Sequence, residues 1–166
     1  SIDSAVTAYV LKSMGHKVIG ATMKLWNNDA EYAEYVKQKG CFNQFQQQNI
    51  DEAKRVAKIL GIEHYVFDCS SEFKYYVLDY MKKEYAKGIM PNPCVICNSV
   101  VKFGVLPQIA RVRGLKFDKF ATGYYARVSA GNNGRYLLMR GLEKKHDESY
   151  YLYRLSQQQL QQMILP

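Results

Sequence analysis

The stretch Pro91-Asn92-Pro93-Cys94-Val95-Ile96-Cys97-Asn98 decides how the second half of this 166-residue chain folds. Each proline fixes φ and removes a backbone donor, so we expect no helix before Cys94. The residues that follow are mostly apolar and suit a helix until Pro107. Two thiols three residues apart are therefore expected at a helix N-terminus. There the helix dipole favours the thiolate, which is the reactive form.

The length and the charge of the chain limit the class of protein to which it can belong. A chain of 166 residues favours a single domain, 1–166, that buries a core without disulfides or a structural metal. The composition, 48% hydrophobic and 23% charged, is that of a globular protein. A formal charge of +8 and a pI near 9.2 favour a polyanionic partner, nucleic acid first. A basic surface without such a role is the alternative.

The cysteines indicate a reducing compartment. Four of them, at 41, 69, 94 and 97, would allow two disulfides in a secreted protein. We recognise no signal peptide, and the cysteine density is below that of small stapled folds, so we expect thiols and a cytoplasmic location. No apolar run approaches the ~20 residues that cross a bilayer, so no membrane partner is expected. The ends, Ser-Ile-Asp-Ser and Ile164-Leu165-Pro166, suggest a fragment.

Hydrophobic periodicity predicts alternating helices and strands. Helices are expected at 3–15, 49–61, 71–88 and 98–113, and strands at 17–23, 64–68 and 117–122. This order predicts an α/β fold with an open, twisted parallel sheet covered by helices on both faces. Residues 27–48 are expected to form a long functional or poorly ordered loop.

Particular residues set the expected element ends. The first helix should be capped by Asp3 or Ser4, with an inward stripe that includes Val6, Tyr9 and Met14. A capping box at Asn49 should begin the second helix and Ser71 should cap the third. Gly104 and Pro107 should kink or shorten the fourth. Near the C-terminus, Gly131-Asn132-Asn133-Gly134 predicts a β-hairpin between 126–129 and 136–140, followed by a short helix at 156–163.

Ser1 to Ser4 opens the first helix at an expected strand-to-helix junction. Nucleotide phosphates commonly bind at such junctions in open parallel sheets, because backbone donors and the helix dipole favour an anion there. Taken alone the signal is weak, since most Asp and Ser residues at helix starts are only caps.

Further motifs occur in order along nearly the whole chain. They are Ile-Asp-Ser at 2–4, Gly-Ala-Thr-Met-Lys-Leu-Trp at 20–26, Leu-Gly-Ile at 60–62, Tyr-Ala-Lys-Gly-Ile-Met-Pro-Asn-Pro at 85–93 leading into Cys97-Asn98 and Lys102-Phe103, Ala-Thr-Gly-Tyr-Tyr-Ala-Arg at 121–127, and Asp-Glu-Ser-Tyr-Tyr-Leu at 147–152. Together they resemble the N-terminal catalytic part of the tRNA-uridine 2-sulfurtransferases (tRNA 2-thiouridylases), which belong to the PP-loop pyrophosphatase superfamily. The Pro-Asn-Pro-x-x-x-Cys-Asn element is the most specific of them.

The resemblance implies a reaction and its participants. ATP with Mg²⁺ would adenylate the C2 oxygen of the wobble uridine in tRNA, and a cysteine persulfide, charged by a sulfur-carrier protein, would then attack C2. A second cysteine would resolve the intermediate. Cys97 aligns with the persulfide-bearing cysteine, whereas Cys94 stands where many relatives have aspartate.

Binding residues are also implied by the resemblance. Asp3 and Ser4 would contact phosphate and magnesium, and Gly123 would lie beside the nucleotide crevice; Ser1 is also taken as nucleotide-binding. Met23 would lie against adenine, or is a core residue. The candidates for RNA contacts are Lys87, Lys102 and Arg127, with solvated surface charge as the alternative.

Three departures from the family pattern matter. The two phosphate-loop glycines are absent between Ser1 and Ile2, which would impair ATP binding if they are truly missing. The family's histidine is Tyr124 here. The sequence also ends before the family's second catalytic cysteine and its later β-domains.

Alternatives remain for the cysteine pair and for the function. Cys94-x-x-Cys97 could be a redox pair, a structural or zinc pair, or, with Cys41, part of an iron–sulfur cluster. Cys69 is expected to be a buried, small hydrophobic residue. The function could instead be that of another PP-loop ATP pyrophosphatase, such as an amidating ligase, or of a basic RNA- or metal-binding module.

Overall fold

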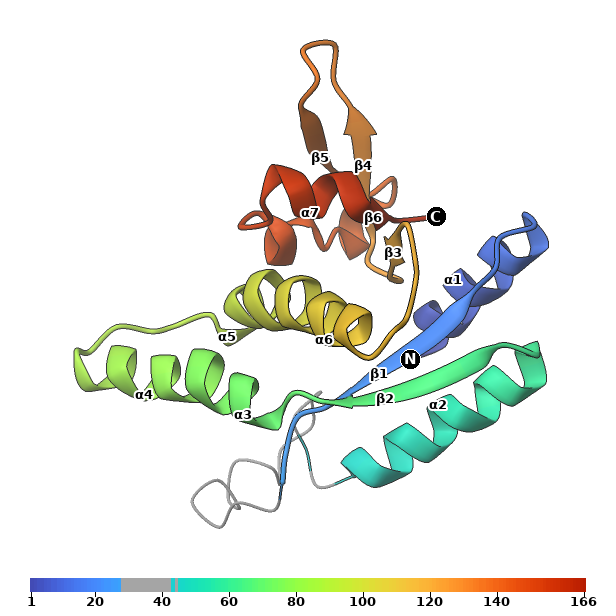
Figure 1. The fold of residues 1–166 in the computed structure, drawn as a ribbon. Coiled ribbons are helices and arrows are strands. Elements are labelled where there is room, and N and C mark those ends of the chain that lie inside the picture. The colour runs from blue at the N-terminus through green and yellow to red at the C-terminus, as the bar shows by residue number, and fades with distance from the viewer. Residues whose placement is uncertain (28–42, 44) are drawn as a thin grey trace.

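The first half of the protein contains a pair of parallel strands flanked by helices. The computed structural model describes residues 1–27, 43 and 45–166 (Figure 1). Strand β1 (Ile19–Lys24) pairs in parallel with β2 (Glu63–Asp68), from Ile19 opposite Glu63 to Lys24 opposite Asp68. Helix α2 (Gln46–Leu60) contacts both strands and also α1 (Ile2–Ser13).

Two long helical segments follow. The first joins α3 (Ser70–Phe73), the π-helical η3 (Lys74–Leu78) and α4 (Asp79–Ala86). The second joins α5 (Pro93–Ile96), the π-helical η4 (Cys97–Val105) and α6 (Leu106–Val112). η3 and η4 pack against each other, so the cysteine-bearing helix lies over the segment that follows β2.

The last part of the chain forms short elements beside the cysteine-bearing helix (Figure 1). Strand β3 (Phe120–Ala121) pairs in parallel with β6 (Met163–Ile164), and β4 (Ala126–Ala130) pairs antiparallel with β5 (Tyr136–Arg140). The predicted hairpin is therefore confirmed. The 3₁₀ turns η5 (Lys144–His146) and η6 (Ser149–Leu152) precede α7 (Gln157–Gln162), which has a capping box at Ser156 and Gln159.

The α/β class is confirmed, but the expected single open sheet is not formed by the described residues. They make three separate two-stranded sheets. The strand expected at 117–122 is reduced to Phe120–Ala121, because its parallel partner β6 has only two residues and begins where α7 ends. Lys119 Nζ donates to the carbonyl of Gln161, and Arg111 lies 4.5 Å from the ring centroid of Phe117.

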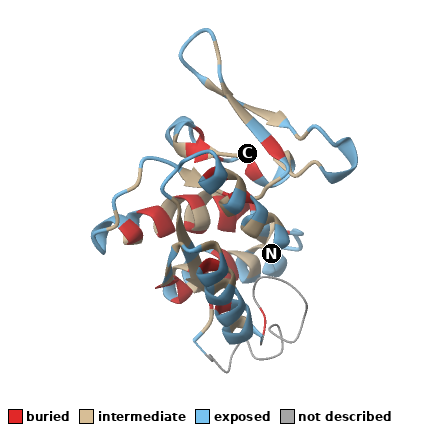
Figure 2. Ribbon diagram, turned by 90° about the vertical axis from the view of Figure 1, so that its right-hand side faces the viewer, coloured by how far each residue is buried: buried red, intermediate tan, exposed pale blue. Residues whose placement is uncertain are grey.

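The core has two neighbouring parts that meet at Phe120. The first surrounds Phe67, Val77 and Val101, and the second surrounds Phe103 and Leu152; Phe120 packs against both. In Figure 2 buried residues line the helices at the centre of the molecule, whereas the hairpin is mostly exposed. Both parts use residues of η4, so the cysteine-bearing helix is the element that joins them.

The helix starts differ from those expected. Helix α1 is capped by Ser1, whose Oγ accepts from Ser4 N at 3.3 Å, rather than by Asp3 or Ser4. Its expected inward residues Val6, Tyr9 and Met14 are exposed, and Thr7 and Leu11 are buried instead. Helix α1 packs against α2, and its buried face is therefore the one that carries Thr7 and Leu11.

Helices α2 and α3 also begin earlier than expected. α2 starts at Gln46, because its side chain binds the end of β1, and so the capping box expected at Asn49 is wrong. α3 starts at Ser70, whose N–H donates to the Asp68 carboxylate at 3.0 Å, so Ser71 is not the cap. The loop expected over 27–48 lies mostly outside the described residues, and its last three residues belong to α2.

The cysteine-bearing helix begins at Pro93, so the expected start at residue 98 is wrong, as is the expectation of no helix before Cys94. Asn92 caps it by accepting from Val95 N at 3.3 Å, and a proline is tolerated at the first helical position because its missing N–H would be unpaired there. The helix continues through Gly104 to Val112, so the expected shortening is wrong. Pro107 leaves the carbonyl of Phe103 without its usual helical donor, and Gln159 Nε2 donates to that oxygen at 3.1 Å.

Pro93–Val112 is also long and apolar enough to meet the length and composition of a membrane span, which the sequence analysis did not anticipate. Half of its apolar window is buried inside the protein. A buried core helix has the same composition, so this finding is weak evidence for a membrane.

Candidate active site

Asp3 and Gly123 lie in direct contact. A Cβ atom placed on Gly123 would lie 2.6 Å from both the carbonyl carbon and the Cβ of Asp3, too close for any side chain. Glycine is therefore required where the segment after β3 crosses the start of α1. The neighbouring Ser1 and Ser4 hydroxyls are 3.3 Å apart on the same helical turn. The structure thus brings together four of the five residues predicted to bind the nucleotide.

Tyr125 holds the Asp3 carboxylate. Its phenol donates to Asp3 Oδ1 at 3.1 Å, and this hydrogen bond raises the pKa of Tyr125. Asp3 is half-buried in the first turn of α1, where a negative charge is stabilised by the helix dipole. Sequence analysis missed Tyr125, although it lies in the 121–127 motif immediately after the expected site residues.

A hollow of about 500 Å³ opens beside Asp3. It is lined by Asp3, Tyr125, Tyr151 and the four residues 145–148. Glu148 fixes this wall, because its carboxylate accepts from Tyr125 N at 3.0 Å and its own N–H donates to the Tyr125 carbonyl at 2.9 Å. Asp147 accepts from the N–H groups of Gly141 and Ser149, and these bonds hold its pKa below the usual value.

Tyr124 connects this region to the cysteine-bearing helix. Its phenol donates to Asn98 Oδ1 at 2.8 Å, and Asn98 Nδ2 donates to the carbonyl of Tyr151 at 3.2 Å. Asn98 is only 3% exposed, so both ends of a buried amide are satisfied. We call the chain of contacts Asp3, Gly123, Tyr124 and Asn98 the glycine–tyrosine link. It joins the start of α1 to the residue after Cys97.

Tyr124 is buried against the helix that carries the two thiols, because its partner Asn98 directly follows Cys97. Burial raises the pKa of Tyr124 to about 12, against the opposing effect of the Asn98 hydrogen bond. Negative charge on Cys97 and Cys94, when these thiols are ionised, also raises the pKa of Tyr124. Lys102 Nζ lies 4.3 Å from the centroid of the Tyr124 ring. The tyrosine that replaces the family's histidine is therefore part of the site.

The two cysteines differ in exposure. Cys94, the second helical residue, is exposed, whereas Cys97, one turn later, is 9% exposed. Cys69 is fully buried in the first part of the core, and burial raises its thiol pKa to about 11. The prediction that Cys69 is a core residue is confirmed. Cys94 and Cys97 share one end of a helix, as expected.

Other predicted binding residues lie elsewhere. Met23 is partly buried against the first part of the core, which fits the core alternative; its contact with adenine stays a prediction. Lys87 pairs with Glu84 at 2.8 Å at the end of α4. Arg127 Nε donates to the carbonyl of Arg140 within the hairpin. Lys102 differs from these two cations because it contacts the glycine–tyrosine link.

The metal-binding side chains of the described residues fit a magnesium ion that is bound together with nucleotide phosphates better than a metal ion that is held by protein side chains alone. Within residues 1–27, 43 and 45–166, no group of three or more His, Cys, Asp and Glu side chains converges on one point. Mg²⁺ is commonly held by one or two carboxylates together with substrate phosphates, and Asp3 could supply one. Cys41, the third ligand of the cluster hypothesis, lies outside the described residues.

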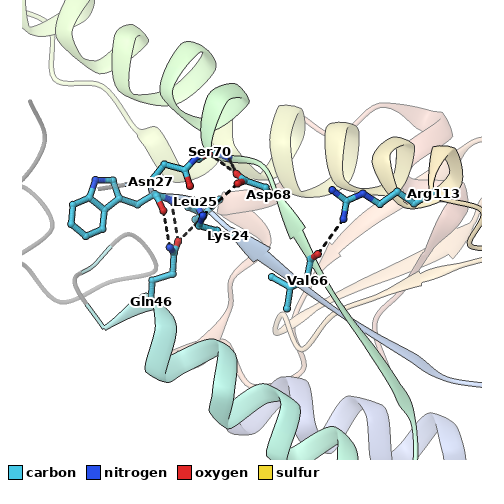
Figure 3. A network of polar contacts seen from close by, with 9 residues as sticks. Lys24, Leu25, Asn27, Gln46, Val66, Asp68, Ser70 and Arg113 are labelled. Atoms are coloured by element: carbon cyan, nitrogen blue, oxygen red, sulfur yellow. Dashed lines mark hydrogen bonds and ion pairs between the residues drawn. The ribbon is translucent and has the colours of Figure 1, made fainter. Parts of the chain in front are cut away.

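A second polar cluster lies where β1 and β2 end (Figure 3). Gln46 Oε1 accepts from the N–H groups of Leu25 and Trp26, and Lys24 pairs with Asp68 at 3.5 Å. Burial opposes ionisation of Asp68, but hydrogen bonds from the hydroxyl and N–H of Ser70 keep its pKa below the usual value. We call Lys24, Gln46, Asp68 and Ser70 the strand-end clamp. Sequence analysis did not anticipate it.

Comparisons with known proteins concern the whole chain. The model of the family described as "tRNA methyl transferase HUP domain" matches residues 1–166. The tRNA-specific 2-thiouridylase MnmA of Endomicrobium trichonymphae is 41% identical over 99% of this chain and 46% of the relative. The proteins of the same name from Clostridium perfringens and Chloroflexus aurantiacus are 41% and 40% identical, each over 99% of this chain and 44% of the relative.

Proposed function

This chain belongs to the family of the tRNA methyl transferase HUP domain, and from that premise we propose that the protein is an ATP-dependent tRNA-uridine 2-sulfurtransferase. The names of the three relatives support 2-thiolation of tRNA. The chain spans about half the length of these relatives, between 44% and 46%, so the activity is proposed for the whole protein that contains it.

One observation carries the proposal. The glycine–tyrosine link places the start of α1, where the nucleotide is proposed to bind, beside the helix that carries Cys97. A reaction that activates a uridine with ATP and then adds sulfur needs both centres close to one base, because the activated carbon has to lie within reach of the sulfur. Neither an amidating ligase nor a simple RNA-binding module needs a thiol at that point.

The proposed reaction has three steps. The C2 oxygen of the uridine attacks the α-phosphorus of ATP, and pyrophosphate leaves. The terminal sulfur of a persulfide on Cys97 then attacks C2, and AMP leaves with the oxygen. Finally a second thiol attacks the Cys97 sulfur of the resulting disulfide, which releases 2-thiouridine and leaves a protein disulfide.

The residues of this chain have distinct proposed roles. Ser1, Asp3, Ser4 and Gly123 bind the phosphates, with Mg²⁺ on Asp3, and Met23 contacts the adenine. Cys97 carries the sulfur that a persulfide carrier protein supplies. Cys94, exposed one turn before it, is proposed as its redox partner.

Contacts with the RNA and the location of the protein are proposed on the same basis. We assign phosphate contacts to Lys87, Lys102 and Arg127, of which Lys102 lies nearest to the link. The protein is proposed to act in the cytoplasm, where tRNA and a carrier protein are available. The formal charge of +8 supports a polyanionic substrate.

The description of the matching family favours a second candidate, methyl transfer to tRNA. Methyl transfer needs no thiol, whereas Cys97 lies beside the link. The two reactions leave different nucleosides. Sulfur replaces an oxygen in one, and a methyl group is added in the other.

The test is thiolation of tRNA by the whole protein with ATP, Mg²⁺ and a persulfide donor, followed by mass spectrometry of the nucleosides. Cys97→Ser should abolish 2-thiouridine formation and leave tRNA affinity nearly unchanged, because only the nucleophile is lost. Cys69→Ala, which removes a fully buried core thiol that has no proposed role in the reaction, is the control and should retain activity. Thiolation by Cys97→Ser would reject the proposal, and a methylated product would favour the second candidate.

A further inference from the structure

Three tyrosines on and just after η6 present their rings to solvent. Tyr150, Tyr151 and Tyr153 are 61%, 38% and 62% exposed. The ring centroids of Tyr150 and Tyr151 are 5.8 Å apart, and those of Tyr150 and Tyr153 are also 5.8 Å apart. Residues three apart share a face of a 3₁₀ turn, which explains why Tyr150 and Tyr153 meet. We call these three residues the tyrosine surface.

The turn beneath the rings is anchored. Leu152 is only 1% exposed and packs in the second part of the core with Phe103 and Leu160. Ser149, at the start of η6, donates through its N–H and its hydroxyl to the Asp147 carboxylate. The rings are therefore exposed on a fixed turn, so little ordering of the backbone would be needed when they bind a partner.

Cations adjoin the tyrosine surface. Lys144, Lys145 and His146 form η5 immediately before it, and Arg154 follows it; all four are exposed. Lys145 and His146 line the hollow together with Tyr151. The carboxylates of that wall, Asp147 and Glu148, accept hydrogen bonds from backbone N–H groups. Exposed aromatic rings beside cations are the combination that binds single-stranded nucleic acid, because bases stack on the rings and the cations attract phosphates.

The tyrosine surface is joined to the thiol site. The carbonyl of Tyr151 accepts from Asn98, the residue after Cys97. A thiol reaches C2 of a uridine only when the base is outside a stacked duplex, so the bases beside it must also be unpaired or splayed. A surface that holds unpaired bases is therefore needed close to Cys97, and the tyrosine surface lies there.

We propose that Tyr150, Tyr151 and Tyr153 stack unpaired bases of an RNA loop next to the base that reacts at Cys97. The inference rests on the proposed function only in taking RNA as the substrate. It goes further by stating which residues hold the loop and that they prefer unpaired to paired RNA. Lys144, Lys145 and Arg154 contact the phosphates of the same loop.

The protein contains a matched control pair on another element. Tyr75 and Tyr76 belong to η3, are 66% and 41% exposed, and have ring centroids 4.9 Å apart. They resemble Tyr150 and Tyr153 in exposure and ring contact, but they have no neighbour that corresponds to Tyr151, which contacts Tyr150 and lines the hollow. If exposure of tyrosine rings alone caused RNA binding, both sets would contribute equally.

The first experiment measures the affinity of the full-length protein for a hairpin RNA with an unpaired loop and for a fully paired duplex, without ATP or sulfur donor. The double variant Tyr150→Ala/Tyr153→Ala should weaken loop binding by about 5- to 150-fold for each base that loses its stacking partner. Duplex binding should change little. Tyr150→Phe/Tyr153→Phe keeps the rings and should bind within about threefold of the unmodified protein.

Three results would overturn the inference. They are unchanged loop affinity in the alanine variant, an equal loss of affinity in Tyr75→Ala/Tyr76→Ala, and an equal loss for loop and duplex. If the alanine variant does not fold, protection of the tyrosine rings from chemical modification in the unmodified protein still tests the inference. Because no reaction is measured, loop binding through the tyrosine surface without thiolation would reject the proposed function and leave this inference standing.

A second experiment tests whether the rings are accessible. Tetranitromethane should nitrate Tyr150 and Tyr153 in the full-length protein, and bound loop RNA should protect both, as peptide mass spectrometry would show. Tyr75 should be nitrated equally with and without RNA. Rings that resist nitration in the absence of RNA would show that another part of the protein covers them, and the inference would then be wrong.

Discussion

The strand-end clamp and the glycine–tyrosine link both depend on a carboxamide side chain, but only the link adjoins the candidate active site. In each, a carboxamide side chain bridges segments far apart in sequence: Gln46 binds Leu25 and Trp26, and Asn98 binds Tyr124 and Tyr151. The clamp joins strand ends to helix starts, and the polar contacts described above for it are made within the protein. The link instead ends on one side at a hollow and on the other at Cys97. A polar cluster is therefore a candidate functional site when it adjoins a hollow or a reactive side chain, and hydrogen bonding alone does not make it one.

The largest effect is expected when the link is broken at its tightest contact. Gly123→Ala places a Cβ 2.6 Å from Asp3 and should displace the start of α1, with a loss of about 1–3 kcal/mol of stability and most of the ATP–pyrophosphate exchange activity. Chemical denaturation and an exchange assay measure these two effects.

Gly15→Ala, at the other end of α1, is the control for this prediction. Gly15 has φ +87° and open space around it, so alanine should cost only about 1 kcal/mol of backbone strain and leave exchange intact. Equal exchange losses in both variants would show that α1 as a whole, and not its contact with Gly123, is needed.

Two substitutions distinguish the role of the Gln46 carboxamide from that of the Asn98 carboxamide. Gln46→Ala and Asn98→Ala should each lower the free energy of unfolding by about 1–3 kcal/mol, since each leaves partly buried backbone or side-chain groups unpaired. Only Asn98→Ala should change the rate of Cys97 alkylation by iodoacetamide in native protein, as followed by mass spectrometry. Tyr124→Phe, which removes one hydrogen bond to Asn98, should change that rate in the same direction by less. An equal change in Gln46→Ala would remove the distinction between clamp and link.

The smallest effect concerns pH and the clamp. The pKa of Asp68 is lowered in the folded protein, so its ionised form adds stability above the pKa of an unfolded aspartate, near 4. That contribution is lost as the pH falls through the lower, folded value. Because the Asp68 side chain is 44% exposed, solvent screening should limit the effect to less than about 1 kcal/mol.

Asp68→Asn should flatten the acid side of the stability curve between about pH 5 and 3, as measured by denaturation at each pH. Its stability at pH 7 should fall by the same small amount. A curve that keeps its full slope would assign the acid sensitivity to other carboxylates.

Sequence patterns predicted elements better than they predicted contacts. The hairpin between β4 and β5 and the helix after Pro91 follow from local turn and proline chemistry, which the sequence carries directly. In contrast, Gln159 donates to the carbonyl of Ser99 in the π-helical η4 although the two residues are sixty positions apart. Periodicity contains no information about such a distant partner.

The residues of the candidate site that were predicted are those to which a sequence motif assigned a role. Asp3 and Gly123 were expected to serve one site, and the structure places them in contact. Asn98, Tyr125 and Tyr151 were missed although they lie in the same motifs, because their roles depend on packing between segments more than twenty residues apart. The sheet was overestimated because strands were counted from apolar runs, and the run at 117–122 bonds as strand only at its end.

The side chain of Gln159 has a consequence for the order in which the protein matures. It donates to the carbonyls of Ser99 and Phe103, and it comes from a helix synthesised after the hairpin and both 3₁₀ turns. On the ribosome the thiol-bearing helix emerges well before α7, and until then these two carbonyls are hydrated. The segment that carries Cys94 and Cys97 therefore gains these two hydrogen bonds only after α7 has been synthesised.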